Sequence, residues 1–328
     1  MGGRQSFPIV SLPRDRIVIV TGGNTGIGYQ TAKWIAMMGA TVIIACRSEH
    51  KAIGAIQDMN QEFQDEKQKG TLGLAHYDKL CVEFMKLDCA SLKSVQEFIE
   101  EFKASGRQLH VLLCNAGINT VKKTLTEDGN ELLFQVNYLS HFLIAVSLLP
   151  VMRMSGRDCR IVFLSSLWYK SGKFDIKKIN AEQETSDTYK SDYYYQKSKL
   201  YLIMLMYKMN RILNQTDVTV TCVHPGIVRT NMMEEFQQQA SFLYRGAISC
   251  ANCLGLSTSV EQGAWTSINT VVNPELTGVR DVYFNNSKPE TIRSHARVKE
   301  DQESLWQFSL DRVKYHLPED ILQDLITK

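Results

Sequence analysis

The chain has 328 residues, 44% of them hydrophobic, which is enough to bury one large core. Its 37 basic and 35 acidic residues leave a net charge of +2, so no positive excess is available for binding nucleic acid. We expect neither an apolar run of membrane-spanning length nor a signal peptide, because the first fifteen residues have no apolar middle. These features predict a cytoplasmic protein.

The eight cysteines are scattered, and Cys46, Cys89, Cys114 and Cys222 lie in or beside apolar runs, where a thiol behaves as a small hydrophobe. This usage favours a reducing compartment. The spacing Cys250-Ala-Asn-Cys253 offers half of a metal or redox site, but no second pair has matching spacing. No metal site is therefore predicted.

The N-terminal residues Met1-Gly2-Gly3-Arg4-Gln5-Ser6 fit the pattern in which Gly2 receives a myristoyl chain. One acyl chain binds a membrane only marginally, and the three nearby arginines add only a weak attraction to anionic lipids. The alternative is a flexible start over residues 1–15. Peripheral membrane contact through Gly2 is thus one of two open interpretations.

From residue 16 onward, apolar runs alternate with amphipathic segments. The run 16–20 is a β-branched strand that ends in glycines, and the next apolar residues recur on one helix face until Gly39. Similar patterns predict strands at 41–45, 82–87, 109–113, 160–164, 218–223 and 281–284, and helices beginning near 48 and 91 and spanning 127–151, 191–213 and 261–272. Strands separated by such helices predict an α/β fold, a single-domain doubly wound parallel sheet of Rossmann type with helices on both faces. This domain would span 16–285, and 286–328 would form a peripheral helical tail.

The turn after the first strand, Thr21-Gly-Gly-Asn-Thr-Gly-Ile-Gly28, is rich in glycine. Glycine adopts positive φ and lets a pyrophosphate approach the unpaired N–H groups at the positive end of a helix. A tight turn without a ligand is the alternative. The position between a strand and an amphipathic helix favours dinucleotide binding.

The second strand is followed by Cys46-Arg47-Ser48, where an acidic side chain would accept hydrogen bonds from the adenosine ribose. Arg47 instead offers a planar set of donors to a 2′-phosphate. We therefore predict preference for NADP(H), with NAD(H) possible. The alternative is that Arg47 is a solvated surface charge.

The stretch DYYYQKSK, residues 192–199, contains two Tyr–Lys pairs with helical i,i+4 spacing. A phenol with a pKa of about 10 needs a nearby cation to act as a base at neutral pH. Tyr195 and Lys199 precede Leu202, Ile203 and Met206, which indicates an inward face. The pair Tyr193 and Lys197 continues instead to Tyr201 and Lys208, which indicates a more polar face, so the first pair is favoured.

Several motifs occur in order: TGGNTGIG at 21–28, Asp88 after the third strand, CNAG at 114–117, Asn137 in FQVNYLSHF, Ser165-Ser166, Tyr195 with Lys199, and PGIVRT at 225–230. Together, over about residues 16–284, they resemble the short-chain dehydrogenase/reductase family. ACR after the second strand and NYLSHF resemble the retinol dehydrogenase branch and the X-linked dehydrogenase/reductase type that acts on polyprenoids. Cys114 departs from the usual asparagine, which removes one amide that would brace the central strand.

The resemblance implies hydride transfer between a nicotinamide and a carbonyl or alcohol carbon. Tyr195 would exchange the proton, Lys199 would lower the pKa of that tyrosine, and Ser166 would polarise the substrate oxygen. Asn137 would help anchor a water leading to Lys199, unless its amide is satisfied by backbone. The implied cofactor-binding residues are Thr21, Gly22, Asn24, Thr25, Gly26, Ile27, Gly28, Arg47, Asp88, Asn115, Ala116, Gly117, Tyr195, Lys199, Pro225, Gly226, Val228 and Thr230, with Asp88 at the adenine and Thr230 at the carboxamide.

Two segments are candidates for the substrate pocket. The insert 167–194 begins with Trp168 and Tyr169, and the apolar segment 242–256, with Phe236 before it, occupies the position of the family's variable lid. Their character predicts a small hydrophobic substrate such as a retinoid, steroid or polyprenoid, or contact with a membrane surface. A lid that packs on its own core is equally compatible.

Two other classes of protein are alternatives to an oxidoreductase. A cofactor-binding regulatory or scaffold protein would have no need of the full Ser–Tyr–Lys–Asn set. A metal enzyme would need a ligand cluster that the sequence lacks. A homodimer formed through the two long helices, 127–151 and 191–213, is possible by resemblance.

Overall fold

The computed structural model describes residues 7–326 except 121, 227 and 229–257. Eight strands form one sheet in the order β3-β2-β1-β4-β5-β6-β7-β8, and all neighbouring pairs are parallel except β7 and β8. The strands are β1 Ile17–Thr21, β2 Thr41–Cys46, β3 Val82–Lys86, β4 Val111–Cys114, β5 Cys159–Leu164, β6 Val218–His224, β7 Tyr283–Asn285 and β8 Lys288–Glu290. This confirms the predicted doubly wound α/β fold.

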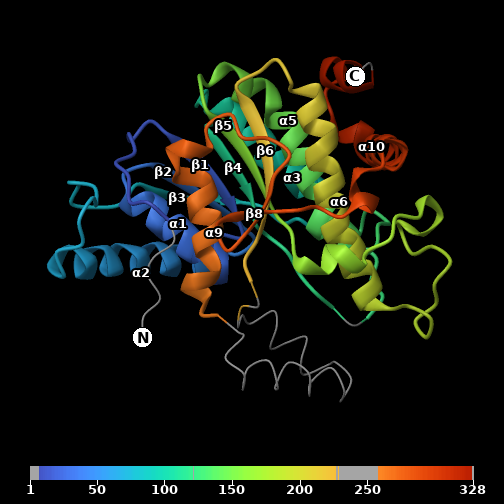
Figure 1. Cartoon of the computed structure of the whole chain (residues 1–328), viewed down its shortest axis with the longest axis horizontal. Helices are drawn as coiled ribbons and strands as arrows, with labels where there is room; N and C mark the ends of the chain where they lie inside the picture. The colour runs from blue at the N-terminus through green and yellow to red at the C-terminus, as the bar shows by residue number, and fades with distance from the viewer. Residues whose placement is uncertain (1–6, 121, 227, 229–257, 327–328) are drawn as a thin grey trace.

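Helices cover both faces of the sheet (Figure 1). The described helices are α1 Gly26–Met37, α2 Glu49–Gln68, α3 Leu92–Ala104, α4 Leu132–Phe134, α5 Ser140–Met154, α6 Ser191–Ile212, α9 Val260–Val272, α10 Lys299–Val313 and α11 Glu319–Ile326. Alternate strand residues face opposite ways. Val18 and Val20 pack with α1, α2 and α9, whereas Ile17 and Ile19 pack with α3, α5, α6 and α10. The sheet thus separates two hydrophobic cores.

The long helix predicted at 127–151 was wrong at its start. The chain turns between Thr126 and Asn130, and helix begins at Leu132, where the Glu131 carboxylate accepts hydrogen bonds from the N–H groups of Leu133 and Phe134 at 2.9 and 2.7 Å. A π-helical segment, Gln135–Leu139, then joins α4 to α5. Such segments are frequent at functional sites.

The C-terminal segment, predicted as peripheral, is helical but belongs to the main core. Trp306 of α10 is only 2% exposed, and its ring lies 5.1 Å from that of Phe142 in α5 and 5.3 Å from the ammonium of Lys208 in α6. The prediction missed this burial because the polar residues of α10 obscure its apolar stripe. Trp306 thus packs against both of the helices for which a homodimer contact is predicted.

Among the described residues, one continuous helical stretch is long and apolar enough to cross a membrane, Leu132–Met154, with a mean hydropathy of 1.7. The expectation that the chain has no apolar run of membrane-spanning length is therefore wrong. However, 94% of this stretch is buried inside the fold. Its apolar character is accounted for by its central place in the core.

Candidate active site

The glycine turn between β1 and α1 has the geometry of an anion site. Gly22 and Gly26 adopt φ values of +65° and +59°, which side chains with a Cβ rarely allow. A Cβ on Gly28 would lie 2.4 Å from the Gly22 carbonyl oxygen, so only glycine fits there. Among the described residues, no side chain caps the N-terminus of α1 at Thr25. Its N–H groups can therefore receive a phosphate.

Thr21 and Asn115 hold the ends of β1 and β4 together. The Thr21 hydroxyl accepts hydrogen bonds from the backbone N–H groups of Asn115 and Ala116, both at 2.9 Å. The Asn115 amide donates to the Thr21 carbonyl at 2.8 Å, and its buried Oδ1 has no partner among the described residues. The neighbouring Cys114 is 1% exposed and packs as an apolar residue. The residues of this turn thus fit a dinucleotide.

Arg47 and Asp88 lie at the carboxyl ends of β2 and β3, which are joined there by the Leu87 N–H and the Cys46 carbonyl at 3.0 Å. Arg47 is exposed and forms no ion pair with the described residues. One oxygen of Asp88 accepts a hydrogen bond from the Ala90 N–H at 2.9 Å. Both side chains are thus placed at the edge where the adenosine half would lie.

The PGIVRT motif is only partly described. Gly226 adopts a φ of +85° directly after β6, and Val228 is buried against Gly263, where an added Cβ would lie 2.4 Å away. Pro225 is half-buried beside them. Thr230, predicted at the carboxamide, lies outside the described residues.

Asn137, in the π-helical segment, braces the loop after β4. Its Oδ1 accepts from the Ile118 N–H at 2.8 Å, and its Nδ2 donates to the Ile118 carbonyl at 3.0 Å and to the Ser198 hydroxyl at 3.1 Å. A Cβ on Gly117 would lie 3.4 Å from Asn137 Oδ1 and 3.5 Å from Lys199 Nζ, so the three residues converge. Both amide hydrogens of Asn137 are used by protein. Its role in anchoring a water stays a prediction.

Ser166, Tyr195 and Lys199 meet at the carboxyl edge of β5. Ser166 follows that strand, and its side chain lies close enough to Tyr195 to lower the pKa of the phenol. The Lys199 ammonium donates to the Leu164 carbonyl at 2.9 Å and lies 5.6 Å from the centre of the Tyr195 ring. The predicted catalytic side chains are thus neighbours in space.

Burial determines the protonation of this pair. It raises the pKa of Tyr195 to about 12, against the smaller opposite effect of Ser166, and it lowers the pKa of Lys199 to about 8. Burial thus sets the direction in which the pKa of Tyr195 is shifted, and the role of Lys199 in making the phenol more acidic stays a prediction. Tyr195 is a phenol at neutral pH and can donate a proton.

The rival pair lies on a buried face, contrary to the prediction of a polar one. Lys197 is only 1% exposed, donates to the Lys178 carbonyl, and lies 4.8 and 5.0 Å from the ring centres of Tyr193 and Tyr194. The Lys178 carbonyl belongs to the insert 167–194, which thus contributes to the burial of Lys197. Lys197 thus has a hydrogen-bond partner within the fold, whereas Tyr195 is the tyrosine whose pKa the side chain of Ser166 affects.

The insert contributes one residue beside the catalytic tyrosine. The ring of Trp168 lies edge-on to that of Tyr195, with centres 6.0 Å apart. Tyr169 is fully buried, and its ring packs on that of Tyr283 with the centres 5.1 Å apart.

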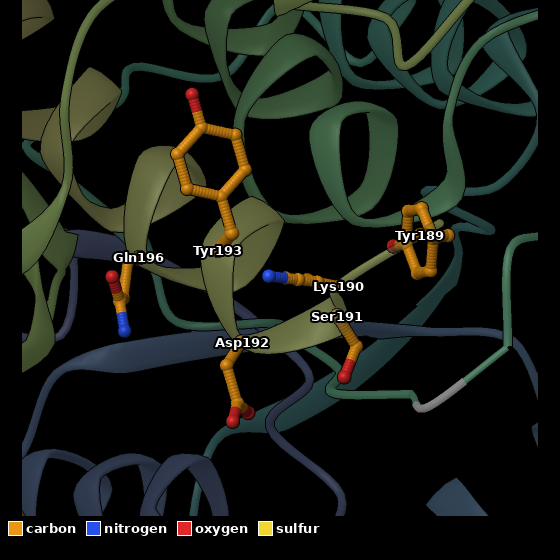
Figure 2. A pocket seen from close by; sticks show the side chains of 6 residues that line it. All are labelled: Tyr189, Lys190, Ser191, Asp192, Tyr193 and Gln196. Atoms are coloured by element: carbon orange, nitrogen blue, oxygen red, sulfur yellow. The ribbon is translucent and has the colours of Figure 1, made fainter. Parts of the chain in front are cut away.

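An open cavity of about 440 Å³ lies at the N-terminal end of α6, next to Tyr195 in the chain. Figure 2 shows its lining side chains, Tyr189, Lys190, Ser191, Asp192, Tyr193 and Gln196. The buried Oδ1 of Asp192 has no partner within the described part of the chain. This lining is mixed polar and aromatic. The apolar segment 242–256 and Phe236 lie outside the described residues.

Two polar residues near the catalytic pair were not singled out from the sequence. His224 is 4% exposed and Tyr283 is 0% exposed. In the described part of the chain, both ring nitrogens of His224 and the hydroxyl of Tyr283 are without a hydrogen-bond partner. The position of His224 directly before the PGIVRT motif was the available signal. The described residues contain no cluster of metal-binding side chains, and Cys250 and Cys253 lie outside them.

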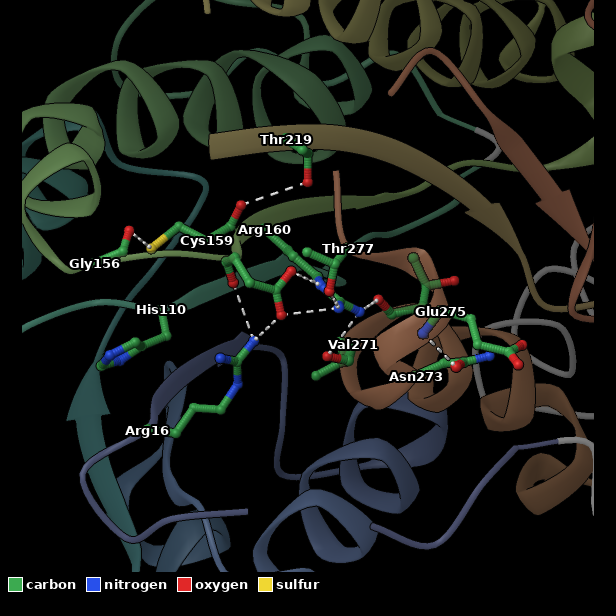
Figure 3. Close-up of polar contacts among 12 residues, drawn as sticks. Arg16, His110, Gly156, Cys159, Arg160, Thr219, Val271, Asn273, Glu275 and Thr277 are labelled. Carbon is green, nitrogen blue, oxygen red and sulfur yellow. Dashed lines mark hydrogen bonds and ion pairs between the residues drawn. The ribbon is translucent and has the colours of Figure 1, made fainter. Parts of the chain in front are cut away.

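A cluster of charged side chains lies at the amino ends of β1 and β5, away from the catalytic residues at the carboxyl ends (Figure 3). Arg160 is 3% exposed and donates to both oxygens of Asp158 at 2.8 and 2.9 Å and to the Thr270 carbonyl at 2.9 Å. Arg16 reaches the same carboxylate at 3.2 Å. All these charged groups have partners, so we assign the cluster a structural role, in which it connects β5 to β1 and α9, and no catalytic role.

Replacing Asp158 with asparagine should lower the free energy of unfolding by about 1–2 kcal/mol, because two arginines lose a charged acceptor. Asparagine tolerates the φ of 60° at this position, so backbone strain is not added. Urea denaturation measures the change. Asp217→Asn, at an exposed position, is the control, and an equal loss in both variants would contradict this account.

A parallel Rossmann sheet with an uncapped glycine turn and a Ser–Tyr–Lys group at its carboxyl edge defines a nicotinamide-dependent oxidoreductase. Residues 16–176 match the model of the short chain dehydrogenase family. Retinol dehydrogenase 14 of Mus musculus is 36% identical over 91% of this chain and 86% of its own length. Polyprenol dehydrogenase of Homo sapiens is 33% identical over 93% of this chain and 87% of its own.

A crystal structure of an uncharacterised protein from Mycobacterium Paratuberculosis has the same fold, with a TM-score of 0.72 and 24% identity over 95% of this chain and 98% of its own. The chain belongs to the short-chain dehydrogenase family. It is therefore an oxidoreductase that acts on CH–OH groups or the corresponding carbonyls.

Proposed function

We propose that this oxidoreductase prefers NADP(H) and interconverts a hydrophobic alcohol and its carbonyl compound. The observation that carries the proposal is the convergence of Ser166, Tyr195 and Lys199 at the carboxyl end of β5, in a sheet whose first strand ends in the uncapped glycine turn. The similarity to retinol and polyprenol dehydrogenases supports a retinoid or polyprenoid-like substrate.

The bound cofactor supplies or receives the hydride. Gly22, Gly26 and Gly28 leave room for its pyrophosphate, and the N–H groups of α1 bind the charge. Ser166 donates a hydrogen bond to the substrate oxygen and orients it toward Tyr195. Tyr195 gives its proton to that oxygen in carbonyl reduction and takes it back in alcohol oxidation. The Lys199 ammonium stabilises the phenolate that forms after the proton leaves.

A screen of hydrophobic aldehydes, ketones and alcohols, with NADPH and NADP⁺ and product analysis, tests this function. We expect turnover of all-trans-retinal or a polyprenal, with the corresponding alcohol as product. Turnover confined to short polar carbonyls would contradict the substrate class, and it would agree with the polar lining of the cavity next to α6.

Replacing Arg47 with serine should lower kcat/KM for NADPH by about 10- to 100-fold, which corresponds to losing a charge-assisted contact of roughly 1.5–3 kcal/mol. The value for NADH should hardly change, because it has no 2′-phosphate. Steady-state kinetics with both cofactors measure this. Lys51→Ser, at another exposed cation near the start of α2, is the control. Equal use of both cofactors by the unmodified protein would defeat the proposed preference.

Membrane contact and self-association remain separate proposals. Contact through a myristoyl group on Gly2 or through the apolar segment 242–256 concerns residues outside the described structure. Vesicle flotation of the acylated and unacylated protein tests it. A homodimer through α5 and α6 would require α10 to move, because α10 covers that pair.

A further inference from the structure

His141 lies fully buried between the two halves of the site. It is 0% exposed and belongs to α5, one helical turn after Asn137 in the π-helical segment. Its ring makes two contacts. Nδ1 lies 3.2 Å from the Asn137 carbonyl oxygen, and Nε2 lies 3.1 Å from the hydroxyl oxygen of Thr21, the last residue of β1. One imidazole thus joins the segment of Asn137 to the strand that ends in the glycine turn.

The partners of this ring determine its tautomer. A carbonyl oxygen only accepts hydrogen bonds, so Nδ1 of His141 carries the hydrogen that is donated to Asn137. Burial lowers the pKa of His141 to about 4, so the ring is neutral at pH 7 and Nε2 is an acceptor. The Thr21 hydroxyl therefore donates its hydrogen to Nε2.

The hydrogen bonds of the Thr21 hydroxyl are consistent with this direction. Its oxygen accepts from the N–H groups of Asn115 and Ala116, both at 2.9 Å, and these bonds use both lone pairs. Its single hydrogen has two acceptors within reach, Nε2 of His141 at 3.1 Å and the Leu113 carbonyl at 3.5 Å. The shorter bond is the stronger one. His141 thus orients the hydroxyl that holds the ends of β1 and β4 together.

The hydrogen bonds continue from His141 to the helix of the catalytic tyrosine. The Nδ2 atom of Asn137 donates to the Ser198 hydroxyl at 3.1 Å, and that hydroxyl donates to the Tyr195 carbonyl at 2.8 Å. The four residues that precede Tyr195 in this row are each 0 or 1% exposed, namely Thr21, His141, Asn137 and Ser198. A continuous row of buried hydrogen bonds thus runs from the glycine turn to α6.

We propose that His141 is a positioning residue that couples the glycine turn to the catalytic residues. This inference rests on the proposed binding of NADP(H) at that turn. The bond from Thr21 to Nε2 keeps the turn in the shape that receives the cofactor. The bond from Nδ1 keeps Asn137 in place, whose Oδ1 lies beside Gly117, as does the ammonium of Lys199. Loss of one nitrogen should therefore weaken cofactor binding, and loss of the other should slow turnover.

Two substitutions of His141 separate the two nitrogens. The amide of His141→Gln reaches the position of Nε2 and accepts from Thr21, whereas the shorter amide of His141→Asn reaches the position of Nδ1 and donates to the Asn137 carbonyl. His141→Asn should raise the NADPH dissociation constant by about 5- to 10-fold at nearly constant kcat, as expected for the loss of one hydrogen bond. His141→Gln should lower kcat by about the same factor at a nearly constant dissociation constant. Fluorescence titration and stopped-flow reduction of all-trans-retinal measure the two quantities.

His110→Gln is the control for this pair. The ring of His110 also bonds the backbone of β1, where it accepts from the Ile17 N–H at 3.0 Å, but this contact is at the amino end of the strand. The substitution should leave both constants unchanged, whatever its effect on Tm. Equal losses of binding and turnover in the two His141 variants, or a lower Tm with both constants unchanged, would assign His141 to packing alone and overturn the proposal.

The tautomer can be measured without cofactor or substrate. ¹⁵N NMR of the seven histidines at pH 7 reports which ring nitrogen carries the hydrogen, and the His141 signals are assigned by their loss in either variant. We expect a neutral ring with the hydrogen on Nδ1. Hydrogen on Nε2, or a charged ring, would interrupt the row at Thr21 and overturn the proposal. Hydrogen on Nδ1 in a protein that binds no NADPH would count instead against the proposed function.

Discussion

Tyr195→Phe should lower kcat by about 10²–10⁴-fold, equivalent to roughly 3–5 kcal/mol in the barrier. The hydroxyl is the group proposed to exchange the proton and lies beside Ser166, whereas the ring contacts with Trp168 and Lys199 remain in the variant. The dissociation constant of NADPH should stay unchanged. Stopped-flow kinetics and fluorescence titration measure the two quantities.

Tyr193→Phe is the matched control for this experiment. Tyr193 lies two residues earlier in the same helix and stacks with Lys197 in the rival pair. Its kcat should equal that of the unmodified protein. A large loss in Tyr193→Phe together with an active Tyr195→Phe would reverse the assignment of the two tyrosines.

Trp306→Ala should lower the free energy of unfolding by about 3–5 kcal/mol, because the indole fills a closed position in the core. The ring contacts Phe142 and Lys208, and its N–H donates to the Leu325 carbonyl at 3.4 Å. One substitution thus loosens α10 from α5 and α6 and weakens the attachment of α11. Urea denaturation followed by circular dichroism measures the loss.

Tyr315→Ala provides the comparison, because Tyr315 belongs to the same C-terminal segment but is 86% exposed. Its stability should change by about 0.5 kcal/mol or less. If Trp306→Ala were equally mild, α10 would not be part of the core in solution.

Local patterns were sufficient to predict most of the sheet. The strands β1, β2, β5 and β6 are β-branched runs buried on both sides, and their predicted bounds agree with the structure within one or two residues. The glycine turn was also predictable, because its function depends on a short stretch with a fixed place between strand and helix.

Features that depend on distant segments could not be predicted. The N–H of Glu131 donates to Asn180 at 2.7 Å, a contact that fixes the start of α4 but comes from the insert. Lys197 appeared solvent-facing for the same reason, since the carbonyl that buries it belongs to Lys178. The pKa of Tyr195 depends on burial by the whole site, and the i,i+4 spacing to Lys199 carries no information on that.

The short strand β8 also has a consequence for the behaviour of the folded protein at high concentration. It is the last strand of the sheet and consists of Lys288, Pro289 and Glu290. Proline has no N–H, and the strand is only three residues long with charged residues at both ends, so extension of the sheet into a neighbouring molecule from this side is disfavoured. This short strand thus disfavours aggregation through the β8 edge of the sheet.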